Sequence, residues 1–424
     1  MQIKILVLKM SQSFATLPQE FLFEYALSLS LTDLYQLCQT NQRLNQLICN
    51  NDFFWHQKFT RDFLPINYLG NWKSLYRSFL SVWTFGSNYA GQLGLGDDTD
   101  RLTPTLVPGI KAKQIVAGGE TSYIIDLNNN VIGFGDNEVG ELGYNNIENI
   151  NVPIFLNFPS ALTMNALFDT IVIDFNNHVW VTGNNITWEL GLGLTQKFIN
   201  TPTQIPNFKA KQVATGSGHT LFIDLNDNVW AVGANFYGQL GLGDKEHRQM
   251  LIMIPHIKAK QVHAGLEHSV ILDFDNNIWV CGQGSYGQLG LGGREDKVML
   301  TVIPELKAKQ VSVGAYYTII TDLKDNIWVW GNNHDGQLGL GDNLNRNVPT
   351  QIPQLKAKQI AAGEDHALMI DLDYNVWVWG KNESGQLGLG DNMSRNVPTR
   401  IPGFKALQIS GGGVHSMMMA TNLI

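Results

Sequence analysis

Short apolar runs alternate with turn residues along most of the chain, from Val82 onward. The runs are rich in Val, Ile, Trp and Phe, and Gly, Asn, Asp or Pro bound each of them. This pattern is typical of β-strands, because the apolar positions of a helix recur at three and four instead. In the segment 367–380, ALMIDLDYNVWVWG, two such runs flank an Asp- and Asn-containing turn, which predicts a β-hairpin.

The strand pattern repeats with a nearly constant period. The motif that opens as VWTFG at Val82 recurs at Val131, Val179, Val229, Ile278, Ile327 and Val376, so the copies are 48 to 50 residues long. Several antiparallel strands in a repeat of this length predict one propeller blade per copy. We therefore predict a mainly β fold, a seven-bladed β-propeller of four-stranded blades over residues 82–424.

The repeat also predicts how the ring closes. The last copy ends after the apolar strand at 417–420, which has no following VWxxG strand. The first VWxxG strand, at 82–86, has no preceding hairpin partner. We expect these two segments to pair, because closure removes exposed sheet edges.

Three elements of each copy resemble the regulator-of-chromosome-condensation repeat: GQLGLG, VWxWG, and a Gly followed three positions later by His. GQLGLG is intact in copies one, four, five, six and seven. Copy three has Trp188 in place of the first Gly, and copy two reads GELGYN at 140–145 and lacks the KAKQ motif, the Gly and the His. The resemblance implies the same seven-bladed ring. The best-known activity of this family is nucleotide exchange on a Ran-like GTPase, which uses a wedge inserted in one blade, and no copy here is longer than the others by such an insertion.

The residues before Val82 follow helical spacing instead. Apolar residues recur at three and four between Leu31 and Ile48. We predict an N-terminal extension over 1–16, an all-α domain over 17–64 and a connecting helix over 65–81.

The all-α domain resembles an F-box. The match comprises LPxE at 17–20, D-L at 33–34, L-C at 37–38, N-x-x-L at 41–44 and FW at 54–55. The resemblance implies a three-helix module that docks on the Skp-type adaptor of a cullin–RING ubiquitin ligase. The positions that match the family's adaptor-facing residues are Leu17, Pro18, Leu22, Leu31, Leu34 and Leu37. The alternative is a helical cap whose leucines are ordinary core residues.

Composition excludes several classes of function. The net charge is −8, which argues against binding nucleic acid by bulk electrostatics. No apolar stretch is long enough for a membrane span. The three cysteines, Cys38, Cys49 and Cys281, show no metal-binding spacing and predict reduced thiols in an intracellular protein of the cytoplasm or nucleus.

The motifs that resemble catalytic or ligand-binding sites have structural explanations. GQLGLG has the order G-x-x-G-x-G, not the nucleotide-binding G-x-G-x-x-G, so its glycines are expected in turns. His219, His268, His366 and His415 share one repeat position, which spreads them around the ring and predicts hydrogen bonds between blades. Cys281 occupies an apolar position and is expected to be buried and inert. We expect no catalytic residue, no metal and no cofactor.

Strand direction predicts two unlike faces. The KAKQ segments and the Asp-Asn turns should share one face, and the Gly-His turns and the loops after VWxxG should share the other. Variable loops on a rigid scaffold are where specificity usually lies. The candidate target-binding residues of the second face are Tyr89, Phe236, Tyr237, Tyr286, His334, Asp335 and Glu383.

These observations predict a non-enzymatic protein-interaction module. The function we favour is a substrate-recruiting subunit of a cullin–RING ubiquitin ligase, with a Skp-type adaptor on the helices and a protein target on the propeller. The alternatives are a nucleotide-exchange factor for a Ran-like GTPase and a scaffold with no ubiquitin link.

Overall fold

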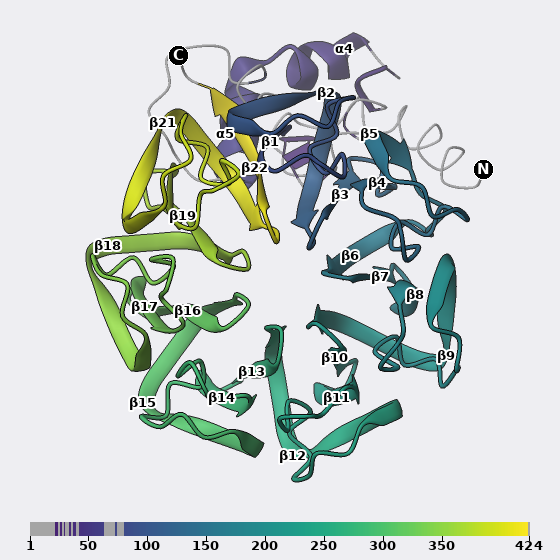
Figure 1. Ribbon diagram of the computed structural model, residues 1–424. Coiled ribbons are helices and arrows are strands. Elements are labelled where there is room, and N and C mark those ends of the chain that lie inside the picture. The colour runs from purple at the N-terminus through teal and green to yellow at the C-terminus, as the bar shows by residue number, and fades with distance from the viewer. Residues whose placement is uncertain are drawn as a thin grey trace. The chain divides into compact units, whose positions relative to one another are not determined.

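The computed structural model describes residues 22–23, 26–27, 29, 34, 37–39, 42–62, 73 and 80–422, with the backbone alone given for 59–62 and 422. The chain divides into two compact units, Met1–Ser81 and Val82–Ile424. The second unit is a ring of blades around a central axis (Figure 1).

Long bent strands link successive blades of this ring. β12, for example, pairs with β11 through its first part and with β13 through its last part, so one strand is the outermost of one blade and the innermost of the next. The bend follows a proline and a residue with positive φ, as at His256 (φ 64°) and Glu305 (φ 61°). This is the chemistry of a type II turn, which turns the chain sharply at the corner. The strands of the ring are β1 (Ser81–Gly86), β2 (Arg101–Ala117), β3 (Thr121–Asp126), β4 (Val131–Gly135), β5 (Ile150–Phe155), β6 (Ala161–Ala166), β7 (Asp169–Asp174), β8 (His178–Asn184), β9 (Phe198–Thr215), β10 (His219–Asp224), β11 (Asn228–Gly233), β12 (Arg248–Ala264), β13 (His268–Asp273), β14 (Asn277–Gly282), β15 (Lys297–Val313), β16 (Tyr317–Asp322), β17 (Asn326–Gly331), β18 (Arg346–Ala362), β19 (His366–Asp371), β20 (Asn375–Gly380), β21 (Arg395–Gly411) and β22 (His415–Asn422).

The ring closes where the sequence predicts. β22 pairs antiparallel with β1, with Val82 opposite Met419 and Gly86 opposite His415, and β1 also pairs with β2. The closing blade therefore combines strands from both ends of the repeat array. This pairing confirms the predicted closure and the mainly β propeller fold.

The hydrophobic cores lie between neighbouring blades. Ile319 and Val329 of one blade pack in the same buried cluster as Met369 and Trp379 of the next. Burying these side chains against the adjacent blade is what holds the ring together.

An aspartate stabilises each hairpin turn at the end of a blade. Asp371 Oδ1 accepts the backbone N–H groups of Asp373 and Asn375, and its Oδ2 accepts the indole N–H of Trp377 at 2.9 Å. Asp174, Asp224, Asp273 and Asp322 bind their turn and a tryptophan in the same way. In the closing blade, which has no such hairpin, the Trp83 indole donates to the carbonyl of Ala420 instead.

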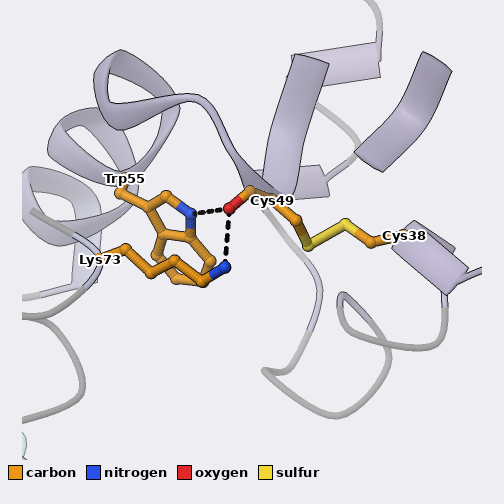
Figure 2. Close-up of a disulfide and its surroundings, with 4 residues drawn as sticks. All are labelled: Cys38, Cys49, Trp55 and Lys73. Carbon is orange, nitrogen blue, oxygen red and sulfur yellow. Dashed lines mark hydrogen bonds between the residues drawn. A yellow bond between two sulfur atoms is a disulfide. The ribbon is translucent and has the colours of Figure 1, made fainter. Parts of the chain in front are cut away.

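The first unit is helical over its described elements, which are α4 (Gln42–Leu44), the π-helix η1 (Asn45–Cys49) and α5 (Asp52–Asp62). Asn51 caps α5, because its Oδ1 accepts the backbone N–H groups of Phe53 and Phe54. Phe54 and Trp55 are buried, and Trp55 and Lys73 both donate to the carbonyl oxygen of Cys49 (Figure 2). Helical structure before Val82 is thus confirmed for these residues, while a three-helix F-box arrangement stays a prediction.

Two cysteines differ from the sequence-based prediction. Cys38 and Cys49 form a disulfide whose Cα atoms are 6.1 Å apart, so the expectation that all three thiols are reduced is wrong for this pair (Figure 2). The residues are eleven positions apart, and only the folding of the helical unit brings them together. No helix among the described residues is long and apolar enough to cross a membrane.

Candidate interaction face

The two faces of the ring differ as strand direction predicts. We call the side that carries the turns before β3, β7, β10, β13, β16, β19 and β22 the turn face, and the opposite side the hairpin face. On the hairpin face, Lys307 of a KAKQ motif donates to the carbonyl of Asp275, and Lys356 donates to the carbonyl of Lys324. The lysines and the Asp-Asn hairpins therefore share one face, as expected.

Backbone hydrogen bonds connect the turns of the turn face from blade to blade. Leu266 N–H donates to the carbonyl of Ala315, Ala315 N–H to that of Glu364, and Glu364 N–H to that of Gly412. These bonds are 3.0–3.1 Å long. The turns thus form a rigid rim that holds variable side chains in fixed positions.

The repeated histidines lie below this rim and join neighbouring blades. His366 Nε2 lies 2.8 Å from Ser416 Oγ. His415 Nε2, in the closing blade, lies 2.8 Å from Ser122 Oγ of the neighbouring blade. Burial lowers the pKa of His366 to about 4 and that of His415 to about 3, so both are neutral at pH 7. His219 and His268 make the equivalent contacts. The predicted interblade hydrogen bonds are confirmed.

The other motifs are structural too. Gly339 has φ +66°, and a Cβ there would lie 2.9 Å from the indole nitrogen of Trp379. This glycine of GQLGLG is therefore required both by the backbone conformation of the turn and by the close packing of the turn on Trp379. Cys281 is fully buried, and burial raises its pKa to about 12, which makes the thiol unreactive. Within the described ranges, no group of three or more His, Cys, Asp or Glu side chains is arranged to hold a metal ion.

The predicted target-binding residues lie on the turn face, but in separate places. The Tyr286 ring is 6.3 Å from the His334 ring, so these two are neighbours. Phe236 instead packs on His247 at 4.3 Å. Tyr89 lies in the closing blade and is 58% exposed, and partial burial and the neighbouring Glu120 raise its pKa. The residues therefore line a broad surface and do not converge on one point.

Sequence reasoning missed the acidic turn residues. Glu364 and Asp365 occupy the two positions between Gly363 and His366, and Glu120 and Glu267 occupy the second of these positions in their own copies. Burial, followed by the charge of Asp365, raises the pKa of Glu364. The sequence does contain a signal for these acids, because the two positions between Gly and His vary from copy to copy while the residues around them are nearly constant.

A cavity of about 270 Å³ lies at the axis of the ring and is lined by the innermost strands and the turns, among them His263, Ser312 and Glu364. Burial lowers the pKa of His263 to about 4, so its imidazole group is neutral at pH 7. Glu364 is the acidic residue of this lining, which connects the cavity with the acidic turns.

Copies two and three depart from the pattern at buried positions. Glu141 of copy two and Glu189 of copy three replace the glutamine of GQLGLG, and Asp169 of copy two replaces the histidine. All three are at most 5% exposed, and neither carboxylate oxygen of Asp169 has a hydrogen-bond partner. Burial raises the pKa of Glu141 to about 7. A group of buried acids thus lies where the other copies have neutral side chains.

The predicted adaptor-binding leucines fall in the first unit. Leu22, Leu34 and Leu37 are buried, with 1%, 1% and 5% exposure. Leu17, Pro18 and Leu31 lie outside the described residues. A role for these six residues in binding an adaptor stays a prediction.

Comparison with known proteins places the propeller in context. A family model described as the RCC1-like domain matches residues 81–418. The chain is 39% identical over 79 residues to the probable E3 ubiquitin-protein ligase HERC4 of Mus musculus, which is 18% of this chain and 8% of that protein. It is 41% identical over 68 residues to the RCC2 homolog of Danio rerio, which is 15% of this chain and 14% of that protein. The chain therefore spans a small part of these relatives.

Solved structures resemble the ring more completely. The crystal structure of human WBSCR16 superimposes with a TM-score of 0.73 at 20% sequence identity, over 81% of this chain and 99% of that one. At this level of identity the likeness concerns the fold alone.

Proposed function

Because this chain belongs to the RCC1-like domain family and its turn face carries variable side chains on a rigid rim, we propose that it is a non-catalytic platform that holds a protein partner on that face. The observation that carries the proposal is the blade-to-blade chain of turn hydrogen bonds, which fixes residues such as Glu364 in place. Fixed side chains lose little entropy on binding, so they favour specific recognition.

We further propose that the helical unit links the propeller to a Skp-type adaptor of a cullin–RING ubiquitin ligase. The support is the F-box-like order of LPxE, D-L, L-C, N-x-x-L and FW in residues 17–55. In this role the chain forms no covalent intermediate. It raises the local concentration of target lysines near the conjugating enzyme, which is a proximity effect.

Co-purification with a recombinant Skp-type adaptor tests this role. We expect the wild-type chain to capture the adaptor and Leu17→Ala/Pro18→Ala to lose capture. Leu225→Ala, at an exposed position of the propeller, is the matched control and should capture normally. Circular dichroism checks that all three are folded. No capture by the folded wild type would overturn the adaptor role and leave an interaction platform without a ubiquitin link.

Nucleotide exchange on a Ran-like GTPase is the less supported alternative. The family's exchange activity uses a wedge inserted in a blade, and every copy here has nearly the same length. Release of labelled nucleotide from a purified Ran-type GTPase measures this activity directly.

A further inference from the structure

The rim of the turn face is acidic. Among the residues that occupy the two variable turn positions of the seven copies, four are acidic and none is basic. The acidic four are Glu120, Glu267, Glu364 and Asp365. Glu364 Oε1 lies close to Gly413, in the turn of the closing blade; burial raises the pKa of Glu364, and the charges of Asp365 and Glu120 add to this rise. Glu364, Asp365 and Glu120 therefore lie near one another, and Glu364 also lines the axial cavity.

The chain neutralises this charge only in part. Burial is the largest cause that raises the pKa of Asp365, and the charge of Asp335 on a neighbouring loop adds to it. Lys381 acts in the opposite direction on the pKa of Glu364 and of Asp365, and its ammonium group also pairs with Glu383 at 3.3 Å. Carboxylates held together in partial burial create a negative potential that an incoming cation relieves.

Aromatic rings accompany the acids on the same rim. The rings of Tyr286 and Tyr316 lie 5.0 Å apart, and the charges of Glu267 and Asp365 both act on the Tyr316 hydroxyl. A carboxylate beside a half-buried aromatic pair is a favourable setting for a lysine ammonium or an arginine guanidinium, through charge-assisted hydrogen bonds and cation–π contact.

Buried glutamines hold two of the turn acids in place. Gln239 and Gln337 donate through Nε2 to the turn acids Glu267 and Asp365. The equivalent Nε2 of Gln92 is buried and has no hydrogen-bond partner among the described residues. The carboxylates of Glu267 and Asp365 are therefore fixed on the rim before a partner binds.

Ion pairs occur on both faces of the ring. Lys309 Nζ lies 2.6 Å from Asp325 on the hairpin face, and Arg346 lies 2.6 Å from Asp342 on the turn face. Among the described residues, the four turn acids form no such pair, so their charge is left for a partner, and its sign calls for a basic one.

We propose that the turn face binds a lysine- and arginine-rich segment of a partner polypeptide, with cationic side chains between the carboxylates of Glu364 and Asp365 and the Tyr286–Tyr316 ring pair. This inference rests on the proposed use of the turn face as a binding platform. A long cationic side chain enters the mouth of the axial cavity, where Glu364 lies.

The test is fluorescence anisotropy with a fluorescein-labelled octa-arginine peptide. An octa-glutamate peptide of the same length, labelled in the same way, is the control of opposite charge. We expect octa-arginine alone to bind and its affinity to fall as salt is raised. The Glu364→Gln/Asp365→Asn variant should bind octa-arginine at least tenfold more weakly, and Tyr316→Leu about threefold more weakly.

The matched control is Asp275→Asn/Asp373→Asn, which removes the same charge from exposed positions of the hairpin face. Equal loss in the control and in the Glu364→Gln/Asp365→Asn variant, or binding of octa-glutamate as tight as that of octa-arginine, would overturn the inference. Circular dichroism and the thermal midpoint confirm that each variant is folded. Adaptor capture, measured on the same preparations, depends on the helical unit, so the ubiquitin-ligase proposal and this inference can fail separately.

Discussion

Glu141 should make the stability of the ring depend on pH. Glu141 is 5% exposed, and burial raises the pKa of its carboxyl from the ordinary value of about 4.5 to about 7. Because the folded pKa lies above the unfolded one, the penalty is absent below pH 4.5 and grows as the pH rises towards 7. At 1.36 kcal/mol for each pKa unit, the ionised group costs the folded state about 3 kcal/mol at pH 8 and about 1 kcal/mol at pH 5.

Glu141→Gln removes this penalty. Glutamine occupies the equivalent position in five other copies, and in one of them Gln239 Oε1 accepts the backbone N–H of Tyr237 just as Glu141 accepts that of Val139. The substitution should therefore preserve the turn. We expect it to stabilise the protein by about 3 kcal/mol at pH 8 and by about 1 kcal/mol or less at pH 5.

Urea unfolding at the two pH values measures the effect. Glu138→Gln is the matched control, because it neutralises an exposed acid of the same loop and should change little at either pH. A gain from Glu141→Gln that is the same at pH 5 and pH 8, or a loss at pH 8, would refute the reasoning, because the benefit must follow ionisation.

Three further predictions concern the ring. Deleting residues 82–86 removes β1 from the closing blade and should lower the thermal midpoint far more than deleting residues 1–10; equal midpoints would contradict the importance of closure. His366→Ala removes the 2.8 Å contact of His366 Nε2 with Ser416 Oγ, while Ser416 still donates to the carbonyl of Gln386, and should cost about 1–3 kcal/mol in urea unfolding at pH 7.5. Since the folded pKa of His366 is lowered to about 4, its contribution is present above pH 6.5 and is lost as the pH falls towards 4, so the difference between wild type and variant should shrink on acidification. Gly339→Ala places a Cβ 2.9 Å from the Trp379 indole at φ +66° and should lower the free energy of unfolding by more than about 1 kcal/mol. Gly292→Ala is the control for the cost of the positive φ alone, because the nearest side-chain atom to its Cβ is 3.9 Å away.

The sequence predicts the ring well because the information is local and repeated. Most copies carry the same strand pattern, the same Asp-Asn hairpin and the same turn glycines, so one interpretation of the motif applies around most of the ring. Closure follows from the same logic, because an unpaired strand at each end of the array has one available partner. The predicted pairing of 82–86 with 417–420 matches the β1–β22 register.

The features that sequence reasoning missed depend on burial or on distant contacts. Asp169 and Glu141 are visible as departures from the repeat, but only the structure places them in a common buried region. The Cys38–Cys49 bond depends on how the helices fold back on each other. On the turn face, Tyr286 was predicted, while its stacking partner Tyr316 was missed because it comes from the next blade's turn.

The β1–β22 pairing has a consequence for synthesis on the ribosome. Trp83 and its hydrogen-bond partner Ala420 are 337 residues apart, so β1 leaves the ribosome long before its partner exists. At about 5–20 residues per second, this strand waits roughly 20–70 s with an unsatisfied edge. An open edge of this kind can pair with another chain, so the nascent protein should depend on chaperones until its last strand is made.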